Sequence, residues 1–133
     1  MKEEEIFMAK KLTKAKIRKL AVDIRQFLLD REMWIDTRIY FNGVAFATDD
    51  GKGHFYYNDP KHLVELPDED PHDYFEYVGP YLSMSFEGPF YDVMNGYLGR
   101  WGYKVEEEFH ELLRKYGVYS ELGNAWNLSV FDI

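Results

Sequence analysis

The chain has 133 residues, 46% of them hydrophobic, which suits one compact domain with its own core. Its formal net charge of −8 argues against nucleic acid as the main partner, because a site for phosphate backbones needs clustered lysine and arginine. Cysteine is absent, which excludes disulfides, thiolate nucleophiles and cysteine-ligated zinc. We therefore expect residues 1–133 to form a single domain.

The charge is unevenly distributed along the chain. Residues 1–25 carry eight basic and four acidic side chains, so the remainder carries −12. The basic stretch is typical of a solvated helix face, with a contact for nucleic acid or an acidic partner as the less favoured alternative, and the acidic remainder would suit a basic partner. No apolar run approaches the roughly 20 residues of a membrane span, and Met1–Glu5 is not followed by the apolar core of a signal peptide. We expect a cytoplasmic protein without a membrane partner.

The first predicted element with a clear pattern is an amphipathic helix from Thr13 to about Met33, and Thr13 suits its N-cap. Ahead of this helix, Ile6-Phe7-Met8 would form a brief first strand or an extension of the helix, and the strand is favoured. The apolar face of the helix recurs at spacings of three and four residues, and consists of Ile17, Leu20, Ala21, Ile24, Phe27 and Leu28.

An antiparallel hairpin is predicted next, because Arg38–Thr48 is rich in β-branched and aromatic residues and 49–53 supplies turn chemistry before His54–Tyr57. Asn42-Gly43 interrupts the first run, as a bulge or, less favoured, as the turn of a separate tight hairpin. Three prolines and an acidic run predict a long surface excursion over 58–73. Its acidic spacing does not match an EF-hand, so we expect a solvated loop instead of a metal site.

Two Gly-Pro pairs are the most informative local feature. Gly79-Pro80 and Gly88-Pro89 bracket the alternating segment Leu82–Glu87, which predicts a strand that turns directly into a helix from Pro89 to about Asn95. A further strand is predicted from Tyr74 to Val78.

The segment Tyr97–Tyr103 alternates glycine with bulky rings, which suits a lid over a pocket and suits an ordinary packed connector nearly as well. A helix from Lys104 to Tyr116, ended by Gly117, and a strand from Trp126 to Phe131 complete the predicted elements. Together they indicate an α+β class, with an antiparallel sheet packed by two main amphipathic helices.

The two halves of the chain echo each other. Leu28-Leu29-Asp30-Arg31 matches Leu112-Leu113-Arg114-Lys115, and Phe41-Asn42 matches Trp126-Asn127, at offsets of 84 and 85 residues. This spacing suggests a duplicated strand-helix-strand-strand unit.

A strand that runs into Gly-Pro-aromatic and then a helix, here Phe86, Gly88, Pro89 and Phe90, resembles the GyrI-like effector-binding domains. The resemblance would span most of the chain. It implies a pseudo-symmetric duplication of the strand-helix-strand-strand unit. It also implies binding of lipophilic cationic ligands by aromatic walls and acidic groups, and some relatives look like hydrolases that use a glutamate.

Strand alternation defines the candidate site. If Met84 and Phe86 face the core, then Ser83, Ser85 and Glu87 face the other side. Glu87 is then either solvated or lines a cleft beneath Tyr97–Tyr103, where it would attract a cation flanked by aromatic rings. The candidate ligand-binding residues are Glu87, Tyr81, Phe90, Tyr91, Trp101 and Tyr103.

Catalytic and metal motifs are not apparent around the four histidines, which are His54, His62, His72 and His110. No nucleophile elbow, His-x-His or His-Glu-x-x-His occurs, so we predict no catalytic triad, no metal site and no cofactor.

Three functions therefore remain, ranked in this order. The first is a small-molecule-binding module, and the second is an acidic protein-interaction or inhibitor domain. The third is a hydrolase with Glu87 as general base, which would need a dry pocket. An exposed sheet edge or the aromatic surface would also allow a homodimer.

Overall fold

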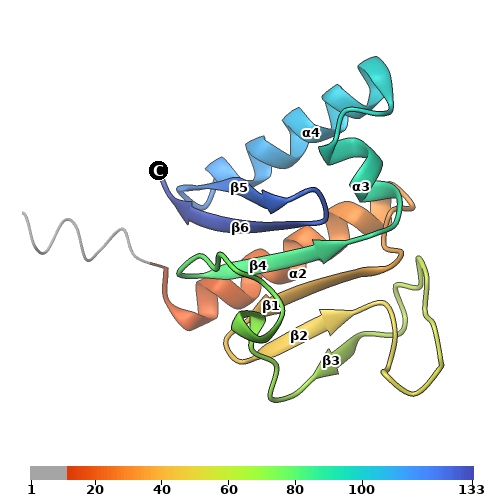
Figure 1. Ribbon diagram of the computed structural model, residues 1–133, viewed down its shortest axis with the longest axis vertical. Coiled ribbons are helices and arrows are strands. Elements are labelled where there is room, and N and C mark those ends of the chain that lie inside the picture. Colours follow the sequence, from red (N-terminus) through yellow and green to blue (C-terminus); the bar gives the residue numbers. More distant parts are fainter. Residues whose placement is uncertain (1–11) are drawn as a thin grey trace, which may run out of the picture.

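The computed structural model describes residues 12–133 and has the predicted α+β architecture (Figure 1). Within these residues, six strands form one antiparallel sheet in the order β3-β2-β1-β4-β6-β5, and three α-helices cover one of its faces. The strands are β1 Thr37–Phe41, β2 Val44–Ala47, β3 Val64–Leu66, β4 Leu82–Phe86, β5 Val118–Asn124 and β6 Asn127–Asp132. The helices are α2 Lys14–Asp30, α3 Pro89–Met94 and α4 Gly99–Arg114, with a 3-10 turn at Pro71–Asp73.

Helix α2 begins as the sequence predicts. The Oγ1 of Thr13 accepts a hydrogen bond from the backbone N–H of Lys16 at 3.2 Å, which satisfies one of the free donors of the first turn. All six residues of the predicted apolar face are buried. The strand predicted at Ile6-Phe7-Met8 lies outside the described residues.

The main core lies between the sheet and the helices. Leu82, Met84 and Phe86 alternate along β4 and all three are buried in it, as the strand pattern predicts. Phe90, at the start of α3, meets Phe86 and Phe109 edge-on, with ring centroids 5.3 and 5.1 Å apart. The strand-to-helix junction thus inserts an aromatic ring into the centre of the core.

The first hairpin turns at Asn42-Gly43, so the favoured bulge at this position is wrong. Both residues have positive φ, 49° and 79°, as a two-residue hairpin turn between right-twisted strands requires. β1 pairs with β2 across this turn. The predicted hairpin with 54–57 does not form, because β3 and β4 take the free edges of β2 and β1, and that run contributes an isolated bridge between Asp49 and Phe55.

Residues 67–80, here called the strap, lie on the sheet face away from the helices, in front of the sheet in Figure 1. The strand predicted over 74–78 does not form there. Instead Phe75 anchors the strap to the sheet, because its side chain is 5% exposed and packs edge-on against Tyr40 of β1. The surface excursion predicted over 58–73 contains the short strand β3 and overlaps the first half of the strap.

Helix α4 begins at Gly99 instead of the predicted Lys104, so most of 97–103, predicted as a lid or a packed connector, is helical. Gly102 is buried, and a Cβ at this position would lie 2.8 Å from Cβ of Leu98. The glycine therefore permits close packing inside a helix and does not mark a hinge. Strand β5, which the sequence did not reveal, pairs with the predicted final strand β6.

A helix followed by a hairpin occurs twice. Shifted forward by 84 residues, α2 would cover 98–114, and α4 covers Gly99–Arg114. The two hairpins are placed differently in the sheet. The first hairpin pairs with β4 through its first strand, β1, and the second pairs with β4 through its second strand, β6. None of the helices in residues 12–133 is both long enough and apolar enough to cross a bilayer.

Candidate functional site

Residues that flank four neighbouring strands meet at one end of the sheet. Asp36 precedes β1, Asp49 follows β2, Glu87 follows β4 and Trp126 precedes β6. Backbone hydrogen bonds align these ends, because the N–H of Glu87 donates to the carbonyl of Asp36 at 3.0 Å and that of Phe86 donates to Trp126 at 2.8 Å. Antiparallel pairing therefore gathers three carboxylates and an indole from distant parts of the sequence.

These residues line a cleft of about 600 Å³ on the face away from the helices. Side chains that alternate outward from β1 and β4, among them Arg38, Tyr40 and Ser85, form its floor. Burial of Tyr40 raises the pKa of its hydroxyl. Phe55, Tyr74, Phe75 and Trp126 supply aromatic walls.

The cleft carries more negative than positive charge. Its carboxylates are Asp36, Asp49, Asp73 and Glu87, and Arg38 is its basic residue. Nη2 of Arg38 lies 3.2 and 3.1 Å from the two carboxylate oxygens of Asp49, with side chains that are 27% and 24% exposed. Glu87 and Asp73 are exposed, and within residues 12–133 neither forms an ion pair.

Asp36 is held by a tyrosine at the rim of the cleft. The hydroxyl of Tyr57 donates to Oδ1 of Asp36 at 2.5 Å. This hydrogen bond raises the pKa of Tyr57 to about 12, because an ionised phenol would lose the bond and face the carboxylate.

The Tyr57–Asp36 bond predicts a specific pH dependence. A phenol whose pKa is higher in the folded state contributes stability that is present below its unfolded pKa of about 10 and is lost as the pH rises towards the folded pKa of about 12. Over that range we expect the unfolding free energy of the wild type to fall more steeply with pH than that of Tyr57→Phe. Urea unfolding at several alkaline pH values would measure both slopes, and equal slopes would contradict the assignment.

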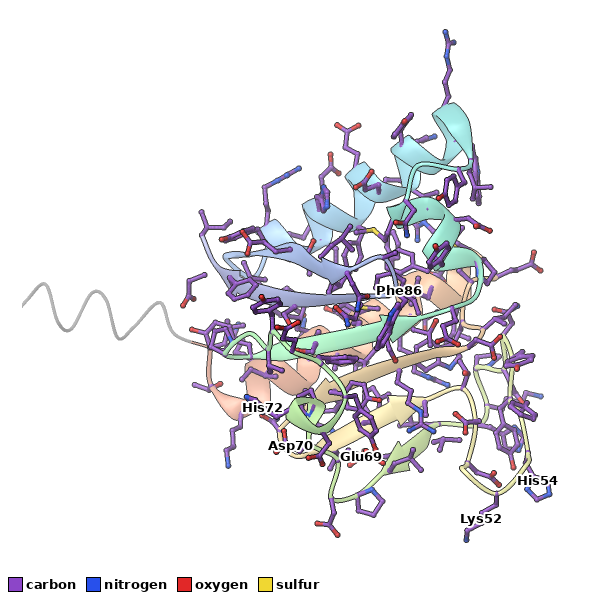
Figure 2. All side chains as sticks on the ribbon, viewed as in Figure 1. Lys52, His54, Glu69, Asp70, His72 and Phe86 are labelled. Carbon is purple, nitrogen blue, oxygen red and sulfur yellow. The ribbon has the colours of Figure 1, made fainter. Side chains whose placement is uncertain are left out.

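Three of the four histidines, all of which lie outside this cleft, contact a nearby aspartate. Nδ1 of His72 lies 2.8 Å from Asp70, and Figure 2 shows both residues on the strap beside Glu69. His54 contacts Asp50 at 2.7 Å and His62 contacts Asp59 at 2.5 Å in the same manner. In the part of the chain from residue 12 onward, no three His, Asp or Glu side chains are grouped so that they could hold a metal ion.

The structure distributes the predicted ligand residues over several places. Glu87 lines the cleft described above. Tyr81 lies at the other end of β4, where its hydroxyl donates to the carboxylate of Asp132 at 2.9 and 3.0 Å. Trp101 lines a different hollow, beside α2 and α4. Glu87, Tyr81 and Trp101 therefore lie at three separate places in the described part of the chain.

The remaining predicted residues also lie away from the cleft lining. Phe90 is fully buried in the core and Tyr91 packs half-buried against it. Tyr103 is 59% exposed on α4, near the exposed Trp101. Aromatic side chains do accompany Glu87, but they come from other elements than we expected.

The sequence reasoning missed Arg38, Phe75 and Trp126. Alternation along β1 sets Arg38 and Tyr40 on one face, and this signal becomes informative only once β1 is paired with β4. No comparable signal marks Phe75, because the strap has no regular period.

Comparison of the chain with protein-family models, curated proteins and solved structures found no match. The function of the cleft is therefore inferred from its own geometry.

Proposed function

We propose that the protein binds a small organic molecule with a cationic group and an aromatic or lipophilic part in the sheet-face cleft. The observation that carries this proposal is that the exposed carboxylate of Glu87 shares one cleft with the rings of Phe75 and Trp126. A carboxylate and an aromatic face both attract an ammonium group, and the attraction strengthens when water is displaced.

The size and the charge of this region support the same ligand class. A volume of about 600 Å³ lies within the range of small-molecule sites. Residues 36–92, which supply most of the cleft, contain 12 acidic and three basic side chains. Such an excess raises the local concentration of cations and the rate at which they arrive.

Hydrolysis with Glu87 as general base has less support. That role needs a carboxyl group withdrawn from water, and Glu87 is exposed. The predicted kinship with GyrI-like domains agrees with a cationic ligand and stays a prediction, as do the cytoplasmic location and the homodimer.

A basic protein partner is the second candidate, favoured by exposed rings beside the acidic strap. Phe55 is 60% exposed, Tyr74 52% and Tyr77 64%. If this surface binds a basic protein, a pulldown from cell extract should recover a partner whose binding weakens as the salt concentration rises. A partner retained at high salt would contradict that mode.

Two nearly isosteric probes test the small-molecule proposal. Phenethylamine carries the ammonium, and 2-phenylethanol replaces it with a hydroxyl. In a proton–nitrogen NMR titration we expect phenethylamine to shift the indole N–H signal of Trp126 at lower concentration than 2-phenylethanol does. The fully buried Trp34 serves as an internal reference.

Glu87→Gln should weaken phenethylamine binding by about five- to tenfold, which corresponds to about 1 kcal/mol for an exposed charge contact. Binding of 2-phenylethanol should change little. Glu107→Gln, on the exposed side of α4, is the matched control and should leave both affinities unchanged. Unchanged phenethylamine binding in Glu87→Gln, or equal affinity for the two probes, would rule out the proposed site.

A further inference from the structure

The floor of the cleft carries a guanidinium, which a site for a simple cation would not need. Arg38 lies on β1, two residues after Asp36, and its side chain lines the same cleft as Glu87. Its N–H groups are hydrogen-bond donors, and a bare ammonium ligand has no acceptor to offer them. Its presence instead suits a ligand that also carries a negatively charged oxygen.

Asp49 occupies only part of the guanidinium. One nitrogen of Arg38, Nη2, reaches both oxygens of the carboxylate, at 3.2 and 3.1 Å. A parallel pairing of guanidinium and carboxylate would use two nitrogens. Nη1 and Nε of Arg38 are therefore not engaged by Asp49, and the side chain is 27% exposed.

The carboxylate that pairs with Arg38 and the carboxylate of Glu87 come from different strands. Asp49, which draws the guanidinium towards it, follows β2, whereas Glu87 follows β4. These two strands flank β1, so their backbones are two strand spacings apart, about 10 Å. Within residues 12–133, Arg38 forms an ion pair with Asp49 and none with Glu87, so one ligand can meet the guanidinium and the Glu87 carboxylate with separate groups.

The rings supply the remaining surface. Phe75 and Trp126 pack against each other with centroids 5.6 Å apart, and both line the cleft. Phe75 is 5% exposed, so it offers a rigid apolar contact.

We propose that the ligand of this cleft is a zwitterion, whose carboxylate accepts hydrogen bonds from Arg38 while its ammonium group faces Glu87. Its apolar part packs against the rings of Phe75 and Trp126. This inference rests on the proposed function, since it concerns the same cleft, and it adds the requirement for a negative group.

Matched pairs of probes separate the two ideas. Phenylalanine is phenethylamine with an added carboxylate next to the ammonium group. 4-(Aminomethyl)benzoate is benzylamine with a carboxylate at the far side of the ring. For each pair, the ratio of the amine dissociation constant to the zwitterion dissociation constant measures what the carboxylate contributes. We expect this ratio to exceed one for at least one pair in the wild type.

Arg38→Gln should lower the ratio of that pair by about five- to tenfold. The carboxylate of the zwitterion loses the guanidinium that binds it, and the amine no longer faces a positive charge. Arg38→Lys, which retains the charge without the planar fork, should lower it less and serves as a second variant if Arg38→Gln folds poorly. Asp49→Asn should raise zwitterion affinity, because the negative charge that competes with the ligand carboxylate for Arg38 is removed. Glu107→Gln on α4 should leave every ratio unchanged.

A wild-type ratio of one or below for both pairs, or a ratio that Arg38→Gln does not lower, would overturn this inference. The proposed function would survive either result, provided that phenethylamine still shifts the Trp126 signal and still requires Glu87. If neither amine nor zwitterion shifts that signal, the proposed function fails and the inference fails with it.

Discussion

Replacing Phe90 by alanine is expected to lower the free energy of unfolding by about 3–5 kcal/mol. The ring is fully buried and packs between Phe86 and Phe109, so its removal leaves a cavity in the centre of the core. Urea unfolding followed by far-UV circular dichroism would measure the change. The result also separates two interpretations of this residue, as a ligand contact or as a core side chain.

The matched control is Tyr97→Ala, on the connection between α3 and α4. Tyr97 is 68% exposed, and we expect its truncation to change the unfolding free energy by less than about 0.5 kcal/mol. If Phe90→Ala does not fold, Phe90→Leu retains much of the buried volume and should cost less. A loss below about 1 kcal/mol for Phe90→Ala would contradict the core assignment.

Gly88→Ala is expected to cost about 1–3 kcal/mol or more, although it adds a single methyl group. The added Cβ would overlap the backbone carbonyl oxygen of Ile35, and a backbone atom cannot move aside as the end of a flexible side chain can. This contact lies beside the hydrogen bond between Glu87 and Asp36 at 3.0 Å. A shift of the backbone there would separate the ends of β1 and β4, so we also expect weaker binding of phenethylamine.

Pro89→Ala is the control for Gly88→Ala, because it changes the same junction without the overlap. Loss of proline at the first helical position mainly increases the freedom of the unfolded chain, and should cost less than about 1 kcal/mol. Thermal unfolding of both variants would give the comparison. Equal stability of the two would show that the close approach to Ile35 is not restrictive.

Local sequence patterns correctly predicted those elements for which only one secondary structure was indicated. The alternation of β4 predicted that Met84 and Phe86 are buried in the core while Ser85 faces the other side. Thr13 predicted the start of α2. The burial of one face defines β4, and one hydrogen bond to Thr13 defines the start of α2. Both effects act within a few residues, so a short stretch of sequence is enough to predict them.

Elements with competing signals were decided by packing. Both Asn42-Gly43 and 49–53 have turn chemistry, and the first makes the hairpin because β2 pairs with β1 on one edge and β3 on the other. Gly99 and Gly102 disfavour a helix by about 1 kcal/mol each. Helix α4 nevertheless includes both, since it buries Val105, Phe109 and Leu113 on one face, and a side chain at Gly102 would collide with Leu98.

The sequence by itself determined the α+β class, the main helices, the strand-to-helix junction and the place of Glu87 where β4 ends. Tertiary structure alone decided what surrounds that carboxylate. Arg38, Phe75 and Trp126 belong to β1, the strap and the start of β6, far from Glu87 in sequence, and they meet it through strand register and the packing of the strap. Register depends on hydrogen bonds and buried surface between strands, which no local pattern contains.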